Sequence, residues 1–187
     1  QGKGQAVITG FTLAQSMAFS HAIQLDADGQ HACEDIPKIL ALAQNDLEAI
    51  ICGIPKYAAS VPKGRLYGRY VTHFWGWVET LSLQIKDSMC GFRLYPLGPT
   101  CEIMAQKNLG RRMDFDTEIL VRLYWRGLAV VNMPTRVTYP ENGASHFRML
   151  ADNVLISWMH TRLTLQMLPR SPGLLWRNVK RWSGRGR

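Results

Sequence analysis

Apolar residues recur along this chain at two spacings, and each spacing predicts a different kind of element. Intervals of three or four residues are typical of amphipathic helices and predict them over about residues 4–17, 66–85, 98–109 and 116–126. Glu34 and Asp35 open a further helix, with Pro37 in its first turn. Short apolar runs at residues 21–25, 48–53 and 91–96 indicate buried strands. Because strands and helices alternate through the first half, we expect an α/β sandwich with a largely parallel sheet.

Three segments carry further signals of how they are arranged. The longest helical pattern has a stripe rich in aromatic residues, which predicts a side that faces the core: Leu66, Tyr70, Phe74, Trp77, Leu81 and Ile85. Residues 54–68 contain two prolines and two glycines and are interpreted as a loop. The β-rich stretch of residues 128–139 contains Pro134, which has no amide hydrogen and so predicts an edge strand or a break.

The composition is that of an ordinary globular domain. With 187 residues, 47% of them hydrophobic and 19% charged, the chain can form one packed core. No apolar run is long enough to span a membrane, and the first residues match neither a signal peptide nor a transit peptide. The cysteines show no metal-binding spacing, which indicates reduced thiols and a cytoplasmic location: Cys33, Cys52, Cys90 and Cys101.

Much of the net charge of +8 comes from the C-terminus, so the body of the chain is closer to neutral and no large nucleic-acid surface is expected. Residues 169–187 hold six basic residues and no acid. A helix there places Leu175, Val179 and Trp182 on one face, which is typical of a helix at a membrane surface, although a solvated tail is the alternative. The residues expected to contact the membrane are Trp176, Arg177, Lys180, Arg181 and Trp182.

Two carboxylates follow the first predicted strand, in the segment Gln-Leu-Asp-Ala-Asp-Gly. If the strand continued, Asp26 and Asp28 would share one face and repel each other. A divalent cation removes this repulsion, since Mg²⁺ and Mn²⁺ prefer carboxylate oxygens and also bind phosphate. Gly29 permits a sharp turn or a close approach to a ligand. The pair alone is also compatible with a solvated turn.

Five segments in order resemble glycosyltransferase family 2, closest to its polyprenol-phosphate (dolichol-phosphate mannosyltransferase-like) branch. They are the Gly-Lys-Gly segment of residues 2–11, the Asp-x-Asp segment with Gly-Gln-His, and the segments at residues 86–96, 115–120 and 133–148. The resemblance covers about residues 2–148. It implies a GT-A-like α/β/α sandwich with a mostly parallel, mixed sheet, and a metal-dependent, inverting transfer of a sugar from a nucleotide-sugar.

The resemblance also implies a set of site residues. Asp26 and Asp28 would hold Mn²⁺ or Mg²⁺, which would neutralise the diphosphate leaving group. Gly91, Phe92 and Arg93 would lie on the acceptor side. The residues expected to bind the donor or its phosphates are Gly2, Lys3, Gly4, Gly29, Gln30, Arg136, Ser145 and His146.

An acceptor hydroxyl would need a base, and three carboxylates are candidates. Asp87 is the first, because it directly precedes a predicted strand among small and apolar residues. Asp116 and Glu118 are its rivals, and their spacing on a helix makes them diverge, so at most one is expected to face the site. An acceptor that is a lipid phosphate is already ionised and needs no strong base; Asp87 would then only position it.

The chain departs from the family pattern before the Gly-Lys-Gly segment, where relatives carry the first strand and the motif that holds the nucleobase. We therefore expect a fragment, with a truncated catalytic domain at residues 1–148 and a basic, amphipathic helical extension at 149–187. The leading hypothesis is transfer to a lipid-linked acceptor by an enzyme on the inner face of the cytoplasmic membrane. Transfer to a polysaccharide or soluble hydroxyl is the alternative, and a non-catalytic membrane- or nucleic-acid-binding module that uses the basic tail is a third reading.

Overall fold

The central strand of the sheet, β3 (Arg93–Pro96), runs antiparallel to the strands on both of its sides. The computed structural model describes residues 2–57, 63–138 and 148–184, and the sheet within them has four strands in the order β1-β3-β2-β4. The other strands are β1 (His21–Gln24), β2 (Ile50–Tyr57) and β4 (Val130–Val137), and of these pairings only β2 with β4 is parallel. The α/β architecture is thus confirmed, whereas the sheet is mixed and not largely parallel.

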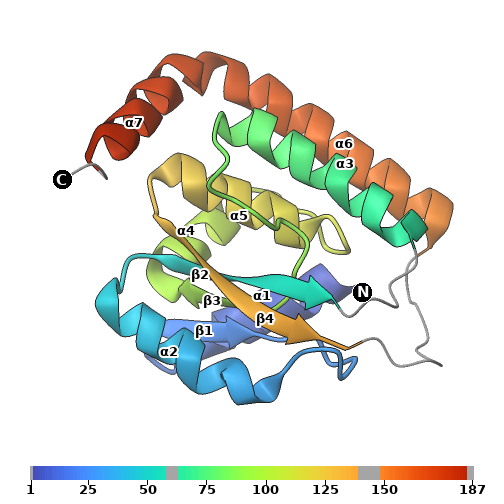
Figure 1. The fold of residues 1–187 in the computed structure, drawn as a ribbon, viewed down its shortest axis with the longest axis vertical. Coiled ribbons are helices and arrows are strands. Elements are labelled where there is room, and N and C mark those ends of the chain that lie inside the picture. The colour runs from blue at the N-terminus through green and yellow to red at the C-terminus, as the bar shows by residue number, and fades with distance from the viewer. Residues whose placement is uncertain (1, 58–62, 139–147, 185–187) are drawn as a thin grey trace.

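A long connection explains the direction of β3. Helix α3 (Lys63–Thr80) returns the chain to the end of the sheet where β2 begins, and residues 81–92 then cross back (Figure 1). At the end of this connection the Gly53 amide donates a hydrogen bond to the Phe92 carbonyl, with an N–O distance of 2.9 Å. A Cβ at Gly53 would lie only 2.8 Å from that carbonyl oxygen, so this glycine permits the close approach. It does not end the strand as predicted, because β2 continues to Tyr57.

One face of the sheet is covered by α2 (Ile36–Asn45), which follows a short turn of 3₁₀-helix, η1 (Cys33–Asp35). Ile39 of this helix is fully buried against Ile51 and Leu94, which point from β2 and β3 to the same side. Burial of these apolar side chains holds the helix to the sheet.

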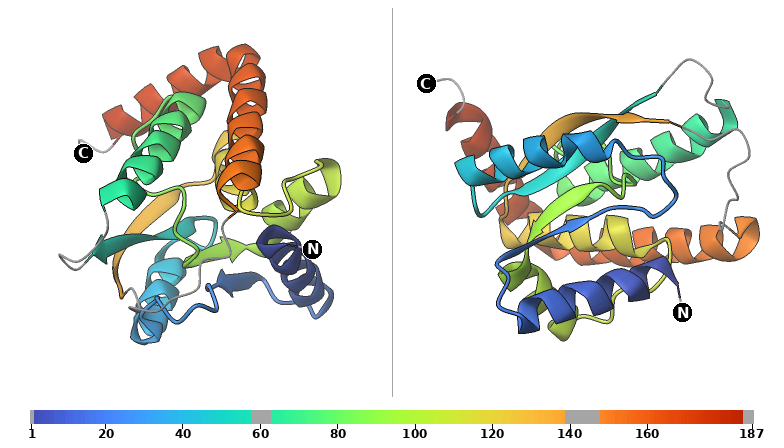
Figure 2. Two further views of the ribbon diagram at one scale, coloured as in Figure 1. Left: turned by 90° about the vertical axis from the view of Figure 1, so that its right-hand side faces the viewer. Right: turned by 90° about the horizontal axis from the view of Figure 1, so that it is seen from below.

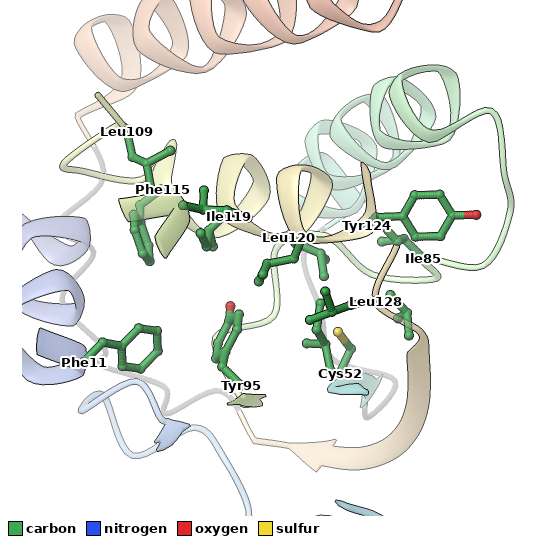
Figure 3. Packing of buried hydrophobic residues seen from close by; sticks show 14 of the residues in the cluster. Phe11, Cys52, Ile85, Tyr95, Leu109, Phe115, Ile119, Leu120, Tyr124 and Leu128 are labelled. Carbon is green, nitrogen blue, oxygen red and sulfur yellow. The ribbon is translucent and has the colours of Figure 1, made fainter. Parts of the chain in front are cut away.

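The opposite face is covered by α1 (Lys3–Ser16), α4 (Leu97–Gln106) and α5 (Phe115–Arg126), which confirm three of the predicted helices with small shifts at their ends. Side chains from these helices meet Tyr95 of β3 in the larger core (Figure 3). The Phe11 and Tyr95 rings lie 5.1 Å apart between centroids. This core fixes the start of α1 and the start of α5 near each other.

The outermost layer contains α3, α6 (Met149–Met167) and α7 (Ser171–Gly184), the last two joined by η2 (Leu168–Arg170). Figures 1 and 2 show this layer stacked over α5, on the side away from α2. Met159 and Leu163 of α6 pack against Val121 of α5. Among the described helices, none combines the length and the hydropathy needed to cross a bilayer.

The aromatic stripe of α3 does not form the core side that its spacing predicts. Tyr70 and Phe74 are more than half exposed. The buried side chains of the helix are polar instead and are those of Thr72, His73, Glu79 and Thr80, although the partly buried Val78 packs against the larger core. The stripe prediction is therefore wrong for these two aromatic residues, because hydrogen bonds and not apolar contacts fill much of the interface beneath α3.

Candidate active site

Asp26 and Asp28 lie in a turn that follows β1, since that strand ends at Gln24. Asp28 is exposed, and its Oδ1 accepts a hydrogen bond from the Gln30 amide at 3.1 Å. Gly29 has φ of +70°, a conformation that favours glycine. The two acids are therefore presented by a turn and not by one face of a strand.

Lys3, the first residue of α1, joins Asp26 to Asp116 at the start of α5. Its Nζ lies 2.7 Å from Oδ1 of Asp26 and 2.6 Å from Oδ2 of Asp116. Burial disfavours the charged form of Lys3, but attraction to Asp116 and Asp26 outweighs this effect and raises the pKa of the ammonium group. The sequence placed these three residues in three separate segments, and the fold brings them into one cluster.

The Asp26 carboxyl is kept ionised by the same arrangement. Burial acts to raise its pKa, but hydrogen bonding from His31 and Lys3 outweighs burial and lowers the pKa to about 2. Nε2 of His31 lies 3.8 Å from Oδ2 of Asp26. The carboxylate is thus negatively charged at neutral pH and available as a cation ligand.

Gly91 provides the space that the Asp26 carboxylate occupies. A Cβ at position 91 would overlap both carboxylate oxygens of Asp26. The predicted metal-binding turn and the predicted acceptor segment are therefore in direct contact, and only glycine fits at this point.

The glycines of the Gly-Lys-Gly segment permit close packing against residues 111 and 112, and their predicted anion binding stays a prediction. The Gly4 amide donates to the Arg112 carbonyl at 3.2 Å, and the Gln5 amide donates to the Arg111 carbonyl at 3.0 Å. A Cβ at Gly2 would lie 2.8 Å from Cγ of Arg112. Since these helix amides already have acceptors, the cationic group that this segment offers is the side chain of Lys3.

Asp116 is the candidate base that borders a cavity. Its Oδ1 accepts a hydrogen bond from Nε2 of Gln24 at 2.7 Å, and its backbone carbonyl accepts one from Arg93 at 2.6 Å. The cavity has a volume of about 80 Å³ and is lined by Lys3, Thr72, Met89, Met113, Asp116, Thr117 and Ile156. Asp116 is thus positioned by protein contacts on one side and faces a small space on the other.

Asp87 is instead surrounded by hydrogen-bond donors. Its Oδ1 accepts from the amides of Met89 and Cys90 at 2.9 and 2.7 Å, and Arg69 binds both carboxylate oxygens. Burial acts to raise the Asp87 pKa, but hydrogen bonding from His73 and the charge of Arg69 outweigh burial and hold the pKa well below its usual range. A carboxylate stabilised in this way is a weak base, so the first-ranked candidate has the geometry of a loop-ordering residue.

Glu118 is also held by contacts within the protein. It points away from Asp116, as the helical spacing predicts. It is fully buried, and its carboxylate binds Arg122 at 2.7 Å, Arg162 at 3.1 Å and the Gly110 amide at 2.9 Å. These contacts tie α5 to α6. Glu118 is absent from the lining of the cavity beside Asp116.

The two larger residues of the predicted acceptor segment are buried. Phe92 belongs to the core beneath α2, and Arg93 has no exposed surface. Nη1 of Arg93 donates to the Tyr95 hydroxyl at 3.2 Å and to the Asp116 carbonyl. Nε and Nη2 of this arginine have no partner within the described part of the chain. Arg93 therefore positions the start of α5 from within the protein, and an acceptor cannot reach it in this structure.

The remaining predicted donor contacts are spread along the edge of the sheet. The Gln30 carbonyl accepts the Thr138 amide at 2.9 Å, which holds the segment that follows Asp28 against the end of β4. Arg136 is largely exposed and lies 3.9 Å from Glu34. Ser145 and His146 lie outside the described residues.

The C-terminal helix turns two of its predicted membrane contacts inward. Arg177 donates to the carbonyls of Tyr124 and Trp125 at 2.6 and 2.9 Å, and Arg181 donates to the Gly127 carbonyl. These carbonyls end α5, where cationic side chains are favoured. Trp176, Lys180 and Trp182 are exposed as expected.

A larger groove runs between α3 and α6 and has a volume of about 520 Å³. Its lining includes Val71, Trp75 and Leu165, and it shares Thr72 and Ile156 with the small cavity beside Asp116. An apolar groove therefore adjoins the charged cluster.

A divalent ion fits the chemistry and the charge of the turn. No group of three or more His, Cys, Asp or Glu side chains forms a ready-made metal site within residues 2–57, 63–138 and 148–184. One or two carboxylates suffice where an ion also binds substrate phosphates. Lys3 and the buried Arg93 supply two positive charges beside the three carboxylates of Asp26, Asp28 and Asp116, so one negative charge remains for a cation to neutralise. Joint binding of one ion by Asp26 and Asp28 stays a prediction.

Sequence reasoning did not assign Gln24 or Thr72 to the site. Gln24 is a buried polar residue two positions before Asp26 in an apolar strand, and its side chain holds Asp116. A lone polar residue in a buried strand was a usable signal. Thr72 carried no signal, because its role depends on which side of α3 faces inward.

Comparisons with known proteins agree on the type of domain. The chain is 26% identical over 149 residues to a UDP-N-acetylglucosamine–dolichyl-phosphate N-acetylglucosaminyltransferase of Methanococcus voltae, covering 75% of the chain and 57% of that protein. It is also 26% identical over 156 residues to an uncharacterized protein of Methanocaldococcus jannaschii, covering 78% of the chain and 64% of that protein. No protein-family model matches the chain.

A solved structure shares the fold. Glucosyl-3-phosphoglycerate synthase from Mycobacterium tuberculosis, in complex with uridine diphosphate, superposes with a TM-score of 0.55 at 14% identity, covering 89% of this chain and 55% of that one. The chain is therefore a distant homologue of a glycosyltransferase and has a GT-A-like fold. It spans less than two thirds of the length of each of these proteins, and the branch within the family stays a prediction.

Proposed function

We propose that this chain belongs to a metal-dependent glycosyltransferase that moves a sugar from a nucleotide-sugar to a lipid-linked acceptor at a membrane surface. The observation that carries the proposal is the Lys3 bridge between Asp26 and Asp116, because one ammonium group holds together the carboxylate that we propose for the metal and the carboxylate that we propose for the acceptor side. The names of the distant homologue and of the structural relative, one acting on dolichyl phosphate and both binding a uridine nucleotide, support this assignment.

The donor side depends on charge. The three carboxylates of Asp26, Asp28 and Asp116 outnumber the two cations beside them, Lys3 and the buried Arg93, so a nucleotide diphosphate alone would meet net negative charge. A Mg²⁺ or Mn²⁺ ion held by Asp26 and Asp28 would reverse that charge and stabilise the diphosphate leaving group. Lys3 keeps Asp116 as a partner if Asp26 turns toward the ion.

The acceptor side depends on Asp116. This carboxylate borders the cavity and is oriented by Gln24, so it can accept the proton of an acceptor hydroxyl, and it holds Lys3, whose ammonium group could meet an acceptor phosphate. Asp87 orders the loop that carries Met89, which also lines the cavity. In this proposal Asp116 takes the acceptor-side role, and Asp87 and Glu118 are structural.

A lipid-linked acceptor is favoured by the groove between α3 and α6. Its apolar lining adjoins the cavity through Thr72 and Ile156, so a hydrocarbon chain in the groove would bring its polar end toward Asp116. A soluble polysaccharide acceptor would have no use for such a lining.

The test measures thermal unfolding with uridine diphosphate, with Mn²⁺, and with both. The proposal predicts a rise in melting temperature that needs both together and that Asp28→Asn abolishes. Glu48→Gln is the matched control, because it removes an exposed carboxylate outside the cluster and should leave the rise unchanged. If the rise is absent, or if Asp28→Asn retains it, the proposed function is contradicted.

A further inference from the structure

Helix α7 exposes its apolar side and buries its polar side. Leu175, Trp176, Val179 and Trp182 are each more than half exposed. The inner side instead makes hydrogen bonds: Arg177 and Arg181 reach the end of α5, and Asn178 donates to the carbonyls of Thr80 and Leu81 at 3.1 and 2.9 Å. A helix that borders only water is expected to have the opposite orientation.

Helix α3 is inverted in the same way. Val71 and Phe74 are exposed, whereas His73 and Glu79 are buried and hydrogen-bonded to Ser88 and His160. Two helices of one layer therefore place aromatic and aliphatic side chains outward and hydrogen-bonding groups inward.

Helix α6 lies beside α3 in this layer (Figure 2) and also exposes apolar residues. Val154, Trp158 and Leu165 follow one another at intervals that keep them on one side of the helix, Leu168 follows in η2, and each is more than half exposed. We call the exposed apolar residues of α3, α6, η2 and α7 the outer helical face. Most of the large apolar side chains that the described residues expose lie on it.

The charges around this face have one sign. The helices contain two acidic residues, Glu79 and Asp152, and both are fully buried. Arg170 and Lys180 are exposed beside the apolar residues. An apolar surface with several tryptophans and exposed cations but no exposed acid matches the interface of an anionic bilayer, where tryptophan and basic side chains are both favoured.

The groove between α3 and α6 opens at the outer helical face. Val71 and Leu165 belong to the face and also line the groove. The groove therefore offers a path from whatever covers the face toward the cavity beside Asp116.

From this geometry we infer that the outer helical face lies on an anionic lipid bilayer, so that a lipid acceptor passes from the bilayer into the groove. This inference rests on the proposed function for the role of the groove, but the docking itself does not require catalysis. It also replaces the basic tail by a three-helix layer as the membrane contact: Arg177 and Arg181 hold α7 in place, and the apolar residues outside them meet the lipid.

The test is flotation with vesicles of phosphatidylcholine alone and of phosphatidylcholine mixed with phosphatidylglycerol. We expect the full chain to float with the mixed vesicles and much less with the neutral ones. The combined variant Trp158→Gln, Trp176→Gln and Trp182→Gln changes only exposed side chains and should reduce flotation by about tenfold or more. Phe19→Gln with Leu47→Gln removes equally exposed apolar residues from other parts of the surface and should float as the unchanged chain does.

Two outcomes would overturn the inference. Equal flotation of the tryptophan variant and the control would place the lipid contact elsewhere. Failure of the unchanged chain to float, together with a dimer that the tryptophan variant loses in light scattering, would assign the face to a second copy of the chain. The thermal shift with uridine diphosphate and Mn²⁺ should persist in the tryptophan variant, so failure of docking and failure of the proposed function are separate results.

Discussion

The carboxylate of Asp26 occupies the space in which a side chain at Gly91 would begin. We expect Gly91→Ala to displace this carboxylate, to destabilise the fold by about 1–3 kcal/mol and to abolish the thermal shift with nucleotide and Mn²⁺. Gly10→Ala is the matched control, because a Cβ there meets nothing within 4 Å and the helix gains up to about 1 kcal/mol. Urea unfolding and the ligand shift measure the two effects. If Gly91→Ala kept the thermal shift with nucleotide and Mn²⁺, Asp26 would not be a ligand of the metal.

Acid should destabilise the protein through Asp26. Its carboxyl has a pKa of about 2 in the folded protein against 3.8 for the ordinary group, so the unfolded chain binds its proton more readily. The stability from this group is therefore complete above pH 4 and lost as the pH falls toward 2, and it amounts to about 2 kcal/mol. Urea unfolding at a series of pH values should show that Asp26→Asn loses less free energy of unfolding in acid than the unchanged chain does. The loss that remains should come from Asp87, whose pKa is also lowered. Glu48→Gln should follow the unchanged chain.

Glu118 should matter for stability and not for ligand binding. Glu118→Gln leaves Arg122 and Arg162 without their buried partner and should cost about 3 kcal/mol. Glu102→Gln removes an exposed carboxylate that pairs with Arg126, and it should change the free energy of unfolding by less than about 0.5 kcal/mol. Below the unfolding transition, Glu118→Gln should keep the nucleotide and Mn²⁺ shift. If the variant stayed folded but lost the thermal shift, Glu118 would have a role in ligand binding.

Arg177 should hold α7 to the body of the protein. Arg177→Ala removes hydrogen bonds to the carbonyls of Tyr124 and Trp125, and we expect a loss of about 1–2 kcal/mol with faster hydrogen exchange across α7. Lys180→Ala is the control: Lys180 is exposed and contacts the Trp176 ring from outside. Exchange that is equally slow in both variants would mean that Leu174, Asn178 and Arg181 anchor the helix without Arg177.

Most helices and strands could be predicted from the sequence, because hydrophobic periodicity and the positions of proline and glycine are local signals. The segments around Lys3, Asp26, Gly91 and Asp116 were each recognised, but their contact depends on a fold that residues 81–92 determine by crossing the sheet. The antiparallel direction of β3 was missed for the same reason.

The sequence also did not predict which side of a helix faces away from the core. Spacing shows that Tyr70 and Phe74 share one side of α3, but it does not show which environment that side meets. The usual assumption, that apolar residues face the core, was wrong here because the polar residues His73 and Glu79 have partners beneath the helix. For the same reason, the composition of the C-terminal helix did not show that Arg177 faces the end of α5.

The polar underside of α7 has one more consequence. Hydrogen bonds are directional, and the bonds from Arg177, Asn178 and Arg181 are satisfied at one rotation of the helix about its axis. Rolling α7 to hide Trp176 and Trp182 from water would leave several buried carbonyls without donors. The tryptophans are therefore locked in their outward orientation before any encounter, and the protein meets its surroundings with a contact that needs no rearrangement.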